Sequence, residues 1–523
     1  MSLIGTGLRL YLSRRLKQLD AIAGKTKQIQ EAQWARLLRK GAACEFGRQH
    51  EFAKLQSIDD YRKAVPLRDW YGFKEGIDRM LGGEPDVLWP GKVEDFAQTS
   101  GTTAGDKFIP ISRDLFKHNQ KAALDIFAHL LRRGVHPSEL FGAKMLFMGG
   151  STQVERNAAG CRVADLSGIM ARGIFWPLNR CYLPGPDVAN LSHWPTKIER
   201  MAEACFDQDV RFATGMPSWM LVLWNRMREM EKERGGSRTS IGELWPRLRV
   251  IVHGGVNYRP FIDRVRAILG EKTTPPLRHE VYPASEAFIA MQDQSPPADD
   301  PYRWMPLRLL TDVNIFFEFV PLEEIDRPDA RAFAAHEVEK EQRYVVVLTT
   351  CAGLWRYIIG DVVVFDSLAD EGAPPRLRIV GRHRHFMNAF GENIIVEHIE
   401  NAVSAAAEQT GARIGEFTAS PIYPGGDRPA GLELVIEWLD PQAPTDAFRE
   451  RFDAAVKEQN VDYTTKRTDD VGMAPPVITT VPTGTFHRWL DACGKLGGQH
   501  KIPRCANHRD IVESVLETAA ASA

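Results

Sequence analysis

The chain has few cysteines for its length, and they are not paired in the sequence. Its 523 residues contain seven cysteines, an odd number, and no Cys-x-x-Cys pair occurs among them. This scatter argues against a disulfide framework and against a cysteine-ligated zinc site. Reduced thiols are typical of the cytoplasm, which is the location that we expect.

Long apolar runs and an excess of charge of either sign are also absent. No apolar stretch approaches the roughly 20 residues that a membrane-spanning helix requires, and the basic, leucine-rich N-terminus lacks the features of a secretory signal. The formal net charge of −2 gives no electrostatic reason to expect nucleic acid or a membrane as the main partner. We therefore expect a small-molecule enzyme, with a monomer as the default state.

A Walker phosphate loop is missing, but another segment carries the parts of a phosphate site. Residues 99–107 read Thr-Ser-Gly-Thr-Thr-Ala-Gly-Asp-Lys and lie between two strand-like runs. The two glycines allow several backbone N–H groups to point into one concavity, and the hydroxyls and the lysine add donors. The segment predicts a polyphosphate site. A polar hairpin between two strands is the alternative, and the segment alone does not decide between them.

The order of strand-like and helix-like segments predicts an α/β protein. A chain of this length exceeds what one core usually supports, so we expect at least two domains. Apolar runs alternate with amphipathic stretches, which favours layered sheets and helices, with mixed sheets allowed. We expect strands at 145–148, 249–252, 315–320, 344–348, 362–365 and 377–380, and helices at 218–234 and 260–269.

A change in composition near residue 380 predicts a domain boundary. We place an N-terminal domain at 1–381 and a C-terminal domain at 382–523, with the basic stretch 381–385 as a hinge or an exposed turn. The second domain has an expected helix from 396, a strand at 432–436 and a helix at 446–461. That is enough for an α+β domain of about 140 residues.

Four segments together carry the groups that a nucleotide needs. Tyr282, Ser285 and Glu286 supply an aromatic ring for a base, a phosphate donor and a hard oxygen ligand for Mg²⁺. Asp361, expected just after a glycine turn, is suited to hold a ribose diol, and Arg382 brings a cation to the same region. Near the C-terminus, a mobile domain could deliver a lysine, Lys501, to a developing phosphate charge. Each residue also has a structural alternative, such as a core aromatic, a helix N-terminal carboxylate, a turn residue or a solvated charge.

In their order along the chain these segments resemble the adenylate-forming superfamily that includes firefly luciferase. Within it, the closer resemblance is to the auxin-responsive Gretchen Hagen Three family of acyl acid–amido synthetases. The resemblance extends over about residues 40 to 515. The segments that carry it are 99–107, 282–286, 315–319, 353–361, 460–467, 484–486 and 501–505.

The family resemblance implies a fold, a reaction and two cofactors. The fold would be α/β, with a large N-terminal adenylate-forming domain of layered mixed sheets and helices and a smaller, mobile α+β C-terminal domain. A carboxylic acid would attack ATP in the presence of Mg²⁺ to give an acyl-adenylate and pyrophosphate. An amino acid would then take the acyl group as an amide and release AMP.

The resemblance also implies roles for individual residues. The catalytic pair would be Lys501, which stabilises charge at the α-phosphate, and Glu286, the magnesium ligand. Tyr282 would stack on adenine. The ATP and AMP contacts would come from Ser100, Gly101, Thr102, Thr103, Gly254, Gly255, Tyr282, Ser285, Asp361 and Arg382.

The acyl pocket is expected at the ends of strand-like runs that precede helices. Its candidate residues are Ser151, Leu166, Ser167, Met216 and Trp219. Plain core packing explains Met216 and Trp219 almost as well. The amine acceptor site is not read from the sequence.

The chain departs from the family pattern at three places. Ala287 replaces the usual glycine, His383-Arg384-His385 replaces an acidic hinge, and Asn388 stands where acyl-CoA ligases often carry lysine. One alternative function is an adenylating ligase that passes the acyl group to coenzyme A or a carrier thiol. The other is a nucleotide-binding sensor without turnover, which the presence of Glu286 and Lys501 disfavours.

Overall fold

The structure is a computed structural model, which describes most of the chain. The described residues are 3–99, 107–150, 153–173, 180–191, 193–255, 258, 261–270, 275–369, 372–383, 386–387, 390, 392, 394–424, 429–439, 445–470, 472–493 and 502–521. Among these residues, no helix combines the length and the apolar character that a membrane span requires.

The described residues form the following helices and strands, given in chain order. The helices are α1 (Leu3–Ala21), α2 (Thr26–Gly41), α3 (Glu45–Gln49), α4 (Ile58–Ala64), α5 (Lys74–Leu81), α6 (Arg113–Arg132), α7 (Pro137–Leu140), α8 (Leu166–Ala171), α9 (Pro186–Ala189), α10 (Trp194–Cys205), α11 (Pro217–Glu233), α12 (Ile241–Leu244), α13 (Ile262–Leu269), α14 (Val396–Thr410), α15 (Thr445–Gln459), α16 (Val461–Arg467), α17 (Thr485–Ala492) and α18 (Asp510–Ala520). The strands are β1 (Asp95–Thr99), β2 (Lys107–Ile111), β3 (Lys144–Phe147), β4 (Glu155–Arg156), β5 (Arg162–Ala164), β6 (Tyr182–Leu183), β7 (Val210–Thr214), β8 (Val250–His253), β9 (Leu277–Pro283), β10 (Phe288–Gln292), β11 (Leu307–Leu309), β12 (Ile315–Pro321), β13 (Phe333–Ala334), β14 (Arg343–Thr350), β15 (Tyr357–Ser367), β16 (Arg376–Arg382), β17 (Phe386–Met387), β18 (Ile394–Ile395), β19 (Ile414–Ile422), β20 (Gly431–Trp438) and β21 (Val477–Val481).

A large mixed sheet forms the body of the molecule. Among the described residues it has twelve strands, in the order β13-β12-β14-β15-β16-β11-β10-β9-β8-β7-β3-β6. The neighbours β9, β8, β7, β3 and β6 run parallel, whereas the strands from β12 to β16 pair antiparallel. A separate sheet has the order β2-β1-β5-β4. The body is therefore an α/β structure with mixed sheets, as expected from the sequence.

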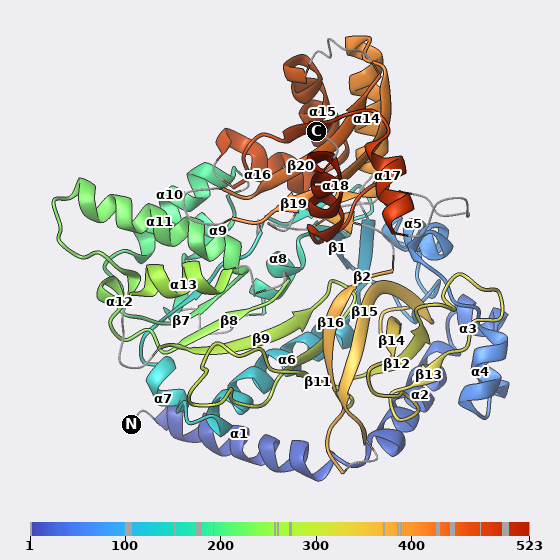
Figure 1. The fold of residues 1–523 in the computed structure, drawn as a ribbon. Helices are drawn as coiled ribbons and strands as arrows, with labels where there is room; N and C mark the ends of the chain where they lie inside the picture. The colour runs from blue at the N-terminus through green and yellow to red at the C-terminus, as the bar shows by residue number, and fades with distance from the viewer. Residues whose placement is uncertain are drawn as a thin grey trace.

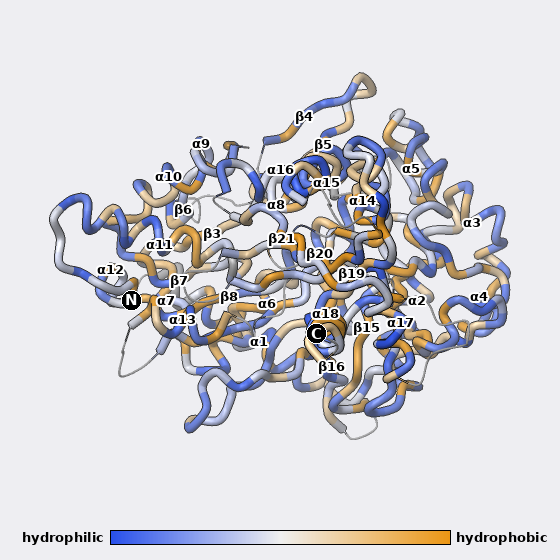
Figure 2. Tube along the Cα trace, turned by 45° about the horizontal axis from the view of Figure 1, so that its top comes forward, coloured by the Kyte–Doolittle hydropathy of each residue, from blue (hydrophilic) through white to orange (hydrophobic). Residues whose placement is uncertain are grey.

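Helices cover both faces of the parallel part of the sheet, and the strand sequences explain why. All four residues of β8 are buried, which is typical of a strand that is covered on both sides. Val250 and Val252 pack in one core cluster with Ile126 of α6, whereas Ile251 packs in another with Trp224 of α11. Successive side chains of a strand point to opposite faces, so α6 lies on one face and α11 on the other. In Figure 2 the apolar colouring is concentrated along these interior segments.

A smaller C-terminal lobe stands on the body, as Figure 1 shows in orange and red. Its sheet has the order β19-β20-β21. Leu434 and Ile436 of β20 join the cluster that contains Phe448 of α15, and Val435 packs with Trp489 of α17 and Val512 of α18. Helices therefore cover both faces of this sheet as well.

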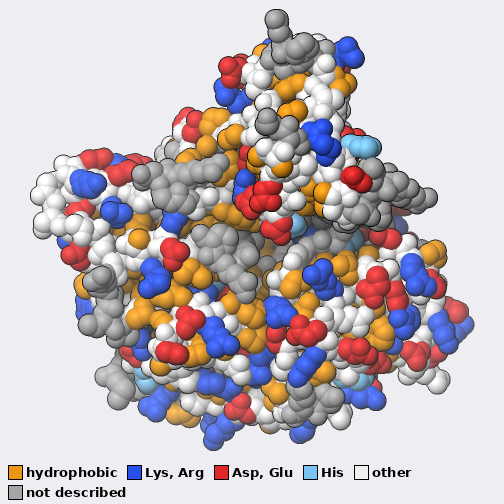
Figure 3. All heavy atoms as spheres, viewed as in Figure 1, with side chains coloured by type: hydrophobic (Ala, Val, Ile, Leu, Met, Phe, Trp, Pro, Cys, Tyr) orange, Lys and Arg blue, Asp and Glu red, His pale blue; other side chains and the backbone are white. Residues whose placement is uncertain are grey.

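The apolar core continues from the body into the C-terminal lobe. One cluster of buried residues contains both Trp224 of α11 and Leu434 of β20. On the outside, Figure 3 shows Lys, Arg, Asp and Glu side chains interspersed over the visible face, in keeping with the near-zero net charge. Strand β16 ends at Arg382, so the chain leaves the large sheet one residue beyond the domain boundary that we predict.

Most of the elements expected from the sequence are confirmed, with one correction. The helix expected at about 446–461 is α15, which ends at Gln459, and the side chain of Asn460 caps the next helix, α16, by accepting from the backbone N–H of Tyr463. The prediction of a turn just before Asp361 is wrong. Gly360 has a φ of +94°, yet both residues lie inside the eleven-residue strand β15.

Candidate active site

The candidate site is built at one edge of the parallel strands. Each of β3, β7, β8 and β9 runs parallel to its neighbour. Their carboxyl ends therefore meet at the same edge, which is where α/β sheets usually bind ligands. The segments that follow these ends are Gly149–Gly150, Gly215–Met216, Gly254–Gly255 and Ala284–Glu286. The residues that we predict from separate stretches of sequence are thus brought together by the fold.

Gly254 and Gly255 have different reasons to be glycine. A Cβ atom on Gly254 would lie 2.3 Å from the carbonyl oxygen of Val281, so no side chain fits between β8 and β9. Gly255 has a φ of +83°, in the left-handed region. A Cβ atom there would contact the side chain of Met216 at 3.3 Å, so Met216 lies beside this turn.

Tyr282, Asp361 and Arg382 form one hydrogen-bonded cluster. The Tyr282 hydroxyl donates to Oδ2 of Asp361 at 2.5 Å, and Nε of Arg382 donates to Oδ1 at 2.6 Å. Asp361 and Arg382 stand opposite each other in the β15–β16 ladder, so the strand register itself aligns the ion pair. The neighbouring Asp361 carboxylate raises the pKa of Arg382, which keeps the guanidinium charged.

Burial and the Asp361 carboxylate together raise the pKa of Tyr282 well above its usual value. The side chain of Tyr282 is buried, with 5% of its surface exposed. Its hydroxyl therefore stays protonated and serves as a donor. The predicted stacking of its ring on adenine is not tested by these contacts and stays a prediction.

Glu286 is held by a tyrosine to which the sequence analysis assigns no role. The hydroxyl of Tyr357 donates to Oε1 of Glu286 at 2.9 Å. Burial raises the pKa of Glu286, and the bond from Tyr357 partly opposes that shift. Tyr357 belongs to the segment 353–361 that carries the family resemblance, and that position was the only signal from which its role might have been read. Ser285 lies beside Glu286 in the turn between β9 and β10.

The donor set around Glu286 fits a magnesium ion that is shared with phosphates. Among the described residues, no group of three or more His, Cys, Asp or Glu side chains is placed to hold a metal. Mg²⁺ commonly takes one or two carboxylates and completes its shell with substrate phosphates and water. The Glu286 carboxylate at this edge of the sheet suits that mode of binding.

Several predicted site residues lie outside the described residues. They are Ser100, Gly101, Thr102, Thr103, Ser151 and Lys501. The strands on either side of the predicted phosphate segment do pair, because β1 and β2 are antiparallel and Thr99 stands opposite Lys107. The segment therefore connects the two strands of a hairpin.

The predicted acyl residues are distributed around the same strand ends. The side chain of Ser167 lies against Gly149, where a Cβ atom would be 3.0 Å from that of Ser167. Its hydroxyl is buried and has no hydrogen-bond partner among the described residues. Leu166 is partly buried and packs against the largest core cluster. Met216 lies beside Gly255, as described above.

Lys197, which the sequence analysis does not single out, supports the same region. Its ammonium donates to the carbonyl oxygens of Gly150 at 2.7 Å and Ala189 at 2.9 Å. Burial lowers its pKa to about 8. Nothing in the sequence around Lys197 distinguishes it from an ordinary helical lysine.

Trp219 lies where the C-terminal lobe contacts the body. Its indole N–H donates to the carbonyl oxygen of Phe390 at 2.9 Å. The ammonium of Lys466 in α16 lies 4.7 Å from the centre of the Trp219 ring and 5.8 Å from that of Trp194. Lys466 is 3% exposed, so its charge is held between the two parts of the molecule.

A buried ion pair connects two of the segments that carry the resemblance. Nε of Arg356 donates to Oε2 of Glu318 at 2.9 Å, and its Nη1 donates to the carbonyl oxygen of Val65 at 2.7 Å. Arg356 has a φ of +51°. These contacts fix the start of β15, the strand that carries Tyr357 and Asp361.

Three sequence profiles of one family match the chain. The GH3 family N-terminal domain matches residues 15–186, the GH3 family central domain 308–382 and the GH3 family C-terminal domain 397–510. Together they cover most of the chain.

Curated relatives match along nearly the whole length. "Probable indole-3-acetic acid-amido synthetase GH3.1" of Arabidopsis thaliana is 21% identical over 96% of this chain and 92% of its own. Jasmonoyl-L-amino acid synthetase JAR4 of Nicotiana attenuata is 26% identical over 96% of this chain and 94% of its own.

Solved structures show the same fold. The AtGH3.15 acyl acid amido synthetase in complex with 2,4-DB has a TM-score of 0.58 at 17% identity and covers 96% of this chain and 95% of its own. A 2-hydroxyisobutyryl-CoA ligase has a TM-score of 0.56 at 15% identity, with coverage of 95% and 92%. The chain belongs to the GH3 family, whose three domains follow one another along it.

Proposed function

We propose that the protein is an acyl acid–amido synthetase, which adenylates a carboxylic acid with ATP and transfers the acyl group to an amino acid. The observation that carries the proposal is the cluster of Tyr282, Asp361 and Arg382 beside Glu286 at the edge of the sheet. Membership of the GH3 family supports the choice of an amino acid as the acceptor.

The first step needs a nucleotide that is held rigidly and phosphates whose charge is neutralised. Asp361 would accept from the ribose hydroxyls while Arg382 holds it in place, and Gly254 and Gly255 would let the base approach the backbone. The segment 100–103 would donate to the phosphates, with Ser285 nearby. Glu286 would hold Mg²⁺, which would neutralise phosphate charge. Catalysis would then rest largely on positioning and electrostatics.

Each of the two steps forms one bond at the reacting centre and breaks another. A carboxylate oxygen of the acid attacks the α-phosphorus, and the bond to the bridging oxygen of pyrophosphate breaks. The amine of the amino acid then attacks the acyl carbon, loses a proton, and AMP leaves as the phosphate oxygen takes the bonding pair. We assign Lys501 to the charge at the α-phosphate in the first step.

The acyl group would lie between the ends of β3 and β7. Leu166, Ser167 and Met216 line this region, with Trp219 at its border with the C-terminal lobe and Ser151 in the connecting segment. We further propose that the enzyme acts in the cytoplasm as a monomer on small-molecule acids and amino acids, without nucleic acid or membrane partners, and that residues 382–523 move as a unit between the two steps.

ATP–pyrophosphate exchange tests the proposal directly. We expect exchange that depends on one member of a panel of aryl, indolyl and fatty carboxylic acids, and AMP release that mixed amino acids increase. Exchange with no response to amino acids, but with a response to coenzyme A, would replace the amine by a thiol acceptor. Binding of ATP without exchange on any acid would contradict the enzyme and favour a nucleotide sensor.

A further inference from the structure

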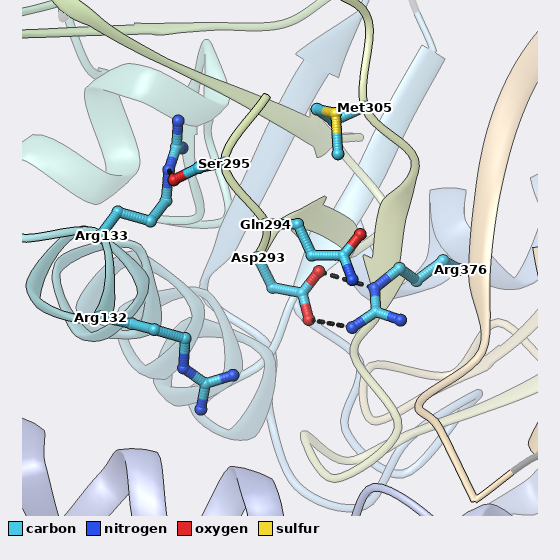
Figure 4. A pocket seen from close by; sticks show the side chains of 7 residues that line it. All are labelled: Arg132, Arg133, Asp293, Gln294, Ser295, Met305 and Arg376. Atoms are coloured by element: carbon cyan, nitrogen blue, oxygen red, sulfur yellow. Dashed lines mark hydrogen bonds and ion pairs between the residues drawn. The ribbon is translucent and has the colours of Figure 1, made fainter. Parts of the chain in front are cut away.

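A pocket lies at the opposite end of the strands from the candidate active site. It has a volume of about 540 Å³ and is lined by Arg132, Arg133, Asp293, Gln294, Ser295, Met305 and Arg376. In Figure 4 the guanidinium of Arg133, at the end of α6, lies beside Ser295, whereas that of Arg132 points the other way, and the paired Asp293 and Arg376 lie across from them. Half of the polar residues that line it are arginines.

The pocket is separate from the nucleotide end of the sheet. Arg376 is the first residue of β16 and Arg382, at the candidate active site, is the last. A strand rises about 3.3 Å per residue, so the two arginines are roughly 20 Å apart. Asp293 directly follows β10, whose other end lies beside Glu286.

Arg133 has no acidic partner, which is unusual for a half-buried arginine. Its guanidinium donates to Oγ of Ser295 at 3.2 Å and to the carbonyl oxygen of Arg278 at 2.8 Å, and it faces Nδ1 of His279 at 3.3 Å. A guanidinium has more N–H groups than these contacts use. Among the described residues, no carboxylate lies within 4 Å of it. Burial, followed by repulsion from Arg278, lowers the pKa of Arg133 to about 10.

The neighbouring Arg278 adds to the positive charge. Arg278 is 6% exposed, its Nε has no hydrogen-bond partner among the described residues, and no carboxylate pairs with it there. The ring nitrogens of the buried His129 are likewise without partners in the described part of the chain. Burial and the nearby arginines, Arg308 first among them, lower the pKa of His129 well below its usual value, so this histidine stays neutral.

Among the described residues that line the pocket, the one acid, Asp293, is already neutralised. Asp293 accepts two hydrogen bonds from Arg376, each of 2.8 Å. A second cation, Arg308, lies 3.9 Å from the same carboxylate. Arg132 pairs with Asp20 but keeps a side chain that is 31% exposed. The positive charge of Arg133, which no carboxylate of the described residues pairs, is therefore available to a ligand.

We propose that this pocket is a second binding site of the protein, which takes a small oxyanion carrying phosphate or carboxylate groups through Arg132, Arg133 and Ser295. An oxyanion supplies the acceptors that the free N–H groups of Arg133 need, and it balances the charge that Arg133 and Arg278 place together. The volume suits a ligand of metabolite size. Nothing in the amide-forming reaction requires this site.

Titration calorimetry on the full chain tests the site, with inorganic phosphate as one probe and malonate as the other. We expect saturable binding of at least one probe with a Kd of about 1 mM or tighter. Arg133→Gln should weaken that binding about tenfold. Arg132→Gln, at a more exposed position, is the second variant. It replaces Arg133→Gln as the test of binding if Arg133→Gln strongly lowers the melting temperature of the protein.

Two controls locate the binding. Arg327→Gln removes an exposed arginine that pairs with Asp329 elsewhere on the surface, and it should leave the affinity unchanged. Asp361→Ala alters the candidate active site and should also leave it unchanged, so failure of the proposed function does not affect the result. If neither probe binds saturably up to about 20 mM, the proposal is overturned. Equal affinities in the wild type and both pocket variants would do the same.

Discussion

At the scale of single residues, the sequence singles out candidate site residues because they lie in short, chemically dense segments. Tyr282 and Glu286 come from one segment and Asp361 from another, and the fold brings all three to one edge of the sheet. The sequence did not show that Tyr282 donates to Asp361 or that Tyr357 donates to Glu286. Those contacts depend on strand pairing, which no local pattern encodes.

Replacing Asp361 tests the cluster around it. Asp361→Ala removes the partner of both Arg382 and Tyr282, so we expect the KM for ATP to rise at least about tenfold, from the loss of charged hydrogen bonds. Steady-state AMP release measures this. Asp366→Ala is the control, because Asp366 lies in the same strand but pairs with Arg378. An unchanged KM in Asp361→Ala would reduce this residue to a structural part of β15.

Replacing Tyr357 tests the state of Glu286 through pH. The hydrogen bond from Tyr357 lowers the pKa of Glu286 against the effect of burial. Tyr357→Phe should therefore raise that pKa. Since the ionised carboxylate is the form that binds Mg²⁺, activity should be lost at a higher pH as the solution is made acidic. We expect the acid limb of the pH–rate profile to move up by about one unit. An acid limb that stays in place would separate Glu286 from catalysis.

At the scale of elements, buried strands were predicted best because their apolar runs are continuous. The strands β8, β12 and β14 fall within one or two residues of the expected ranges. One element was misread because long-range pairing overrode the local pattern. Strand β14 pairs with β15 on both sides of Gly360, which extends the strand through that glycine.

Helix α16 gives a prediction about the contact between the lobes. Lys466→Met keeps the apolar stem but removes the charge over Trp219 and Trp194, a contact worth roughly 1–2 kcal/mol. We expect hydrogen exchange in α16 and at the start of α11 to become about tenfold faster, measured by mass spectrometry. Lys457→Met is the control, because Lys457 pairs with Asp453 inside the C-terminal lobe. It should leave hydrogen exchange at the start of α11 unchanged. Equal exchange in Lys466→Met and wild type would show that the contact does not hold the lobes.

At the scale of the whole molecule, the class of fold followed from the alternation of strands and helices, whereas the order of strands in the sheet did not. The twelve-stranded sheet places β11 beside β16 and β10, an arrangement that joins segments far apart in sequence. Composition marked the change near residue 380, but it carried no information on how the C-terminal lobe rests on the body. Composition could not predict contacts such as the hydrogen bond from the Trp219 indole to the carbonyl oxygen of Phe390.

The predicted movement of residues 382–523 can be tested through Lys501. Lys501→Ala should slow acyl-adenylate formation by about 10²-fold or more, as expected for the loss of one electrostatic group. Amide formation from supplied acyl-adenylate should change little, because the C-terminal domain would have turned away by then. Rapid-quench measurement of the two steps separates them. Equal losses in both would argue against a domain rotation between the steps.

The register of β15 and β16 has a consequence for how this protein can vary. Asp361 and Arg382 face each other at one end of the ladder, and Ser367 and Arg376 close it at the other. A one-residue deletion within either strand would misalign the ion pair and turn the side chains beyond it to the other face. The connection between Ser367 and Arg376 lies outside that constraint. The strand register therefore tolerates a longer chain there, while the paired strands keep Asp361 opposite Arg382.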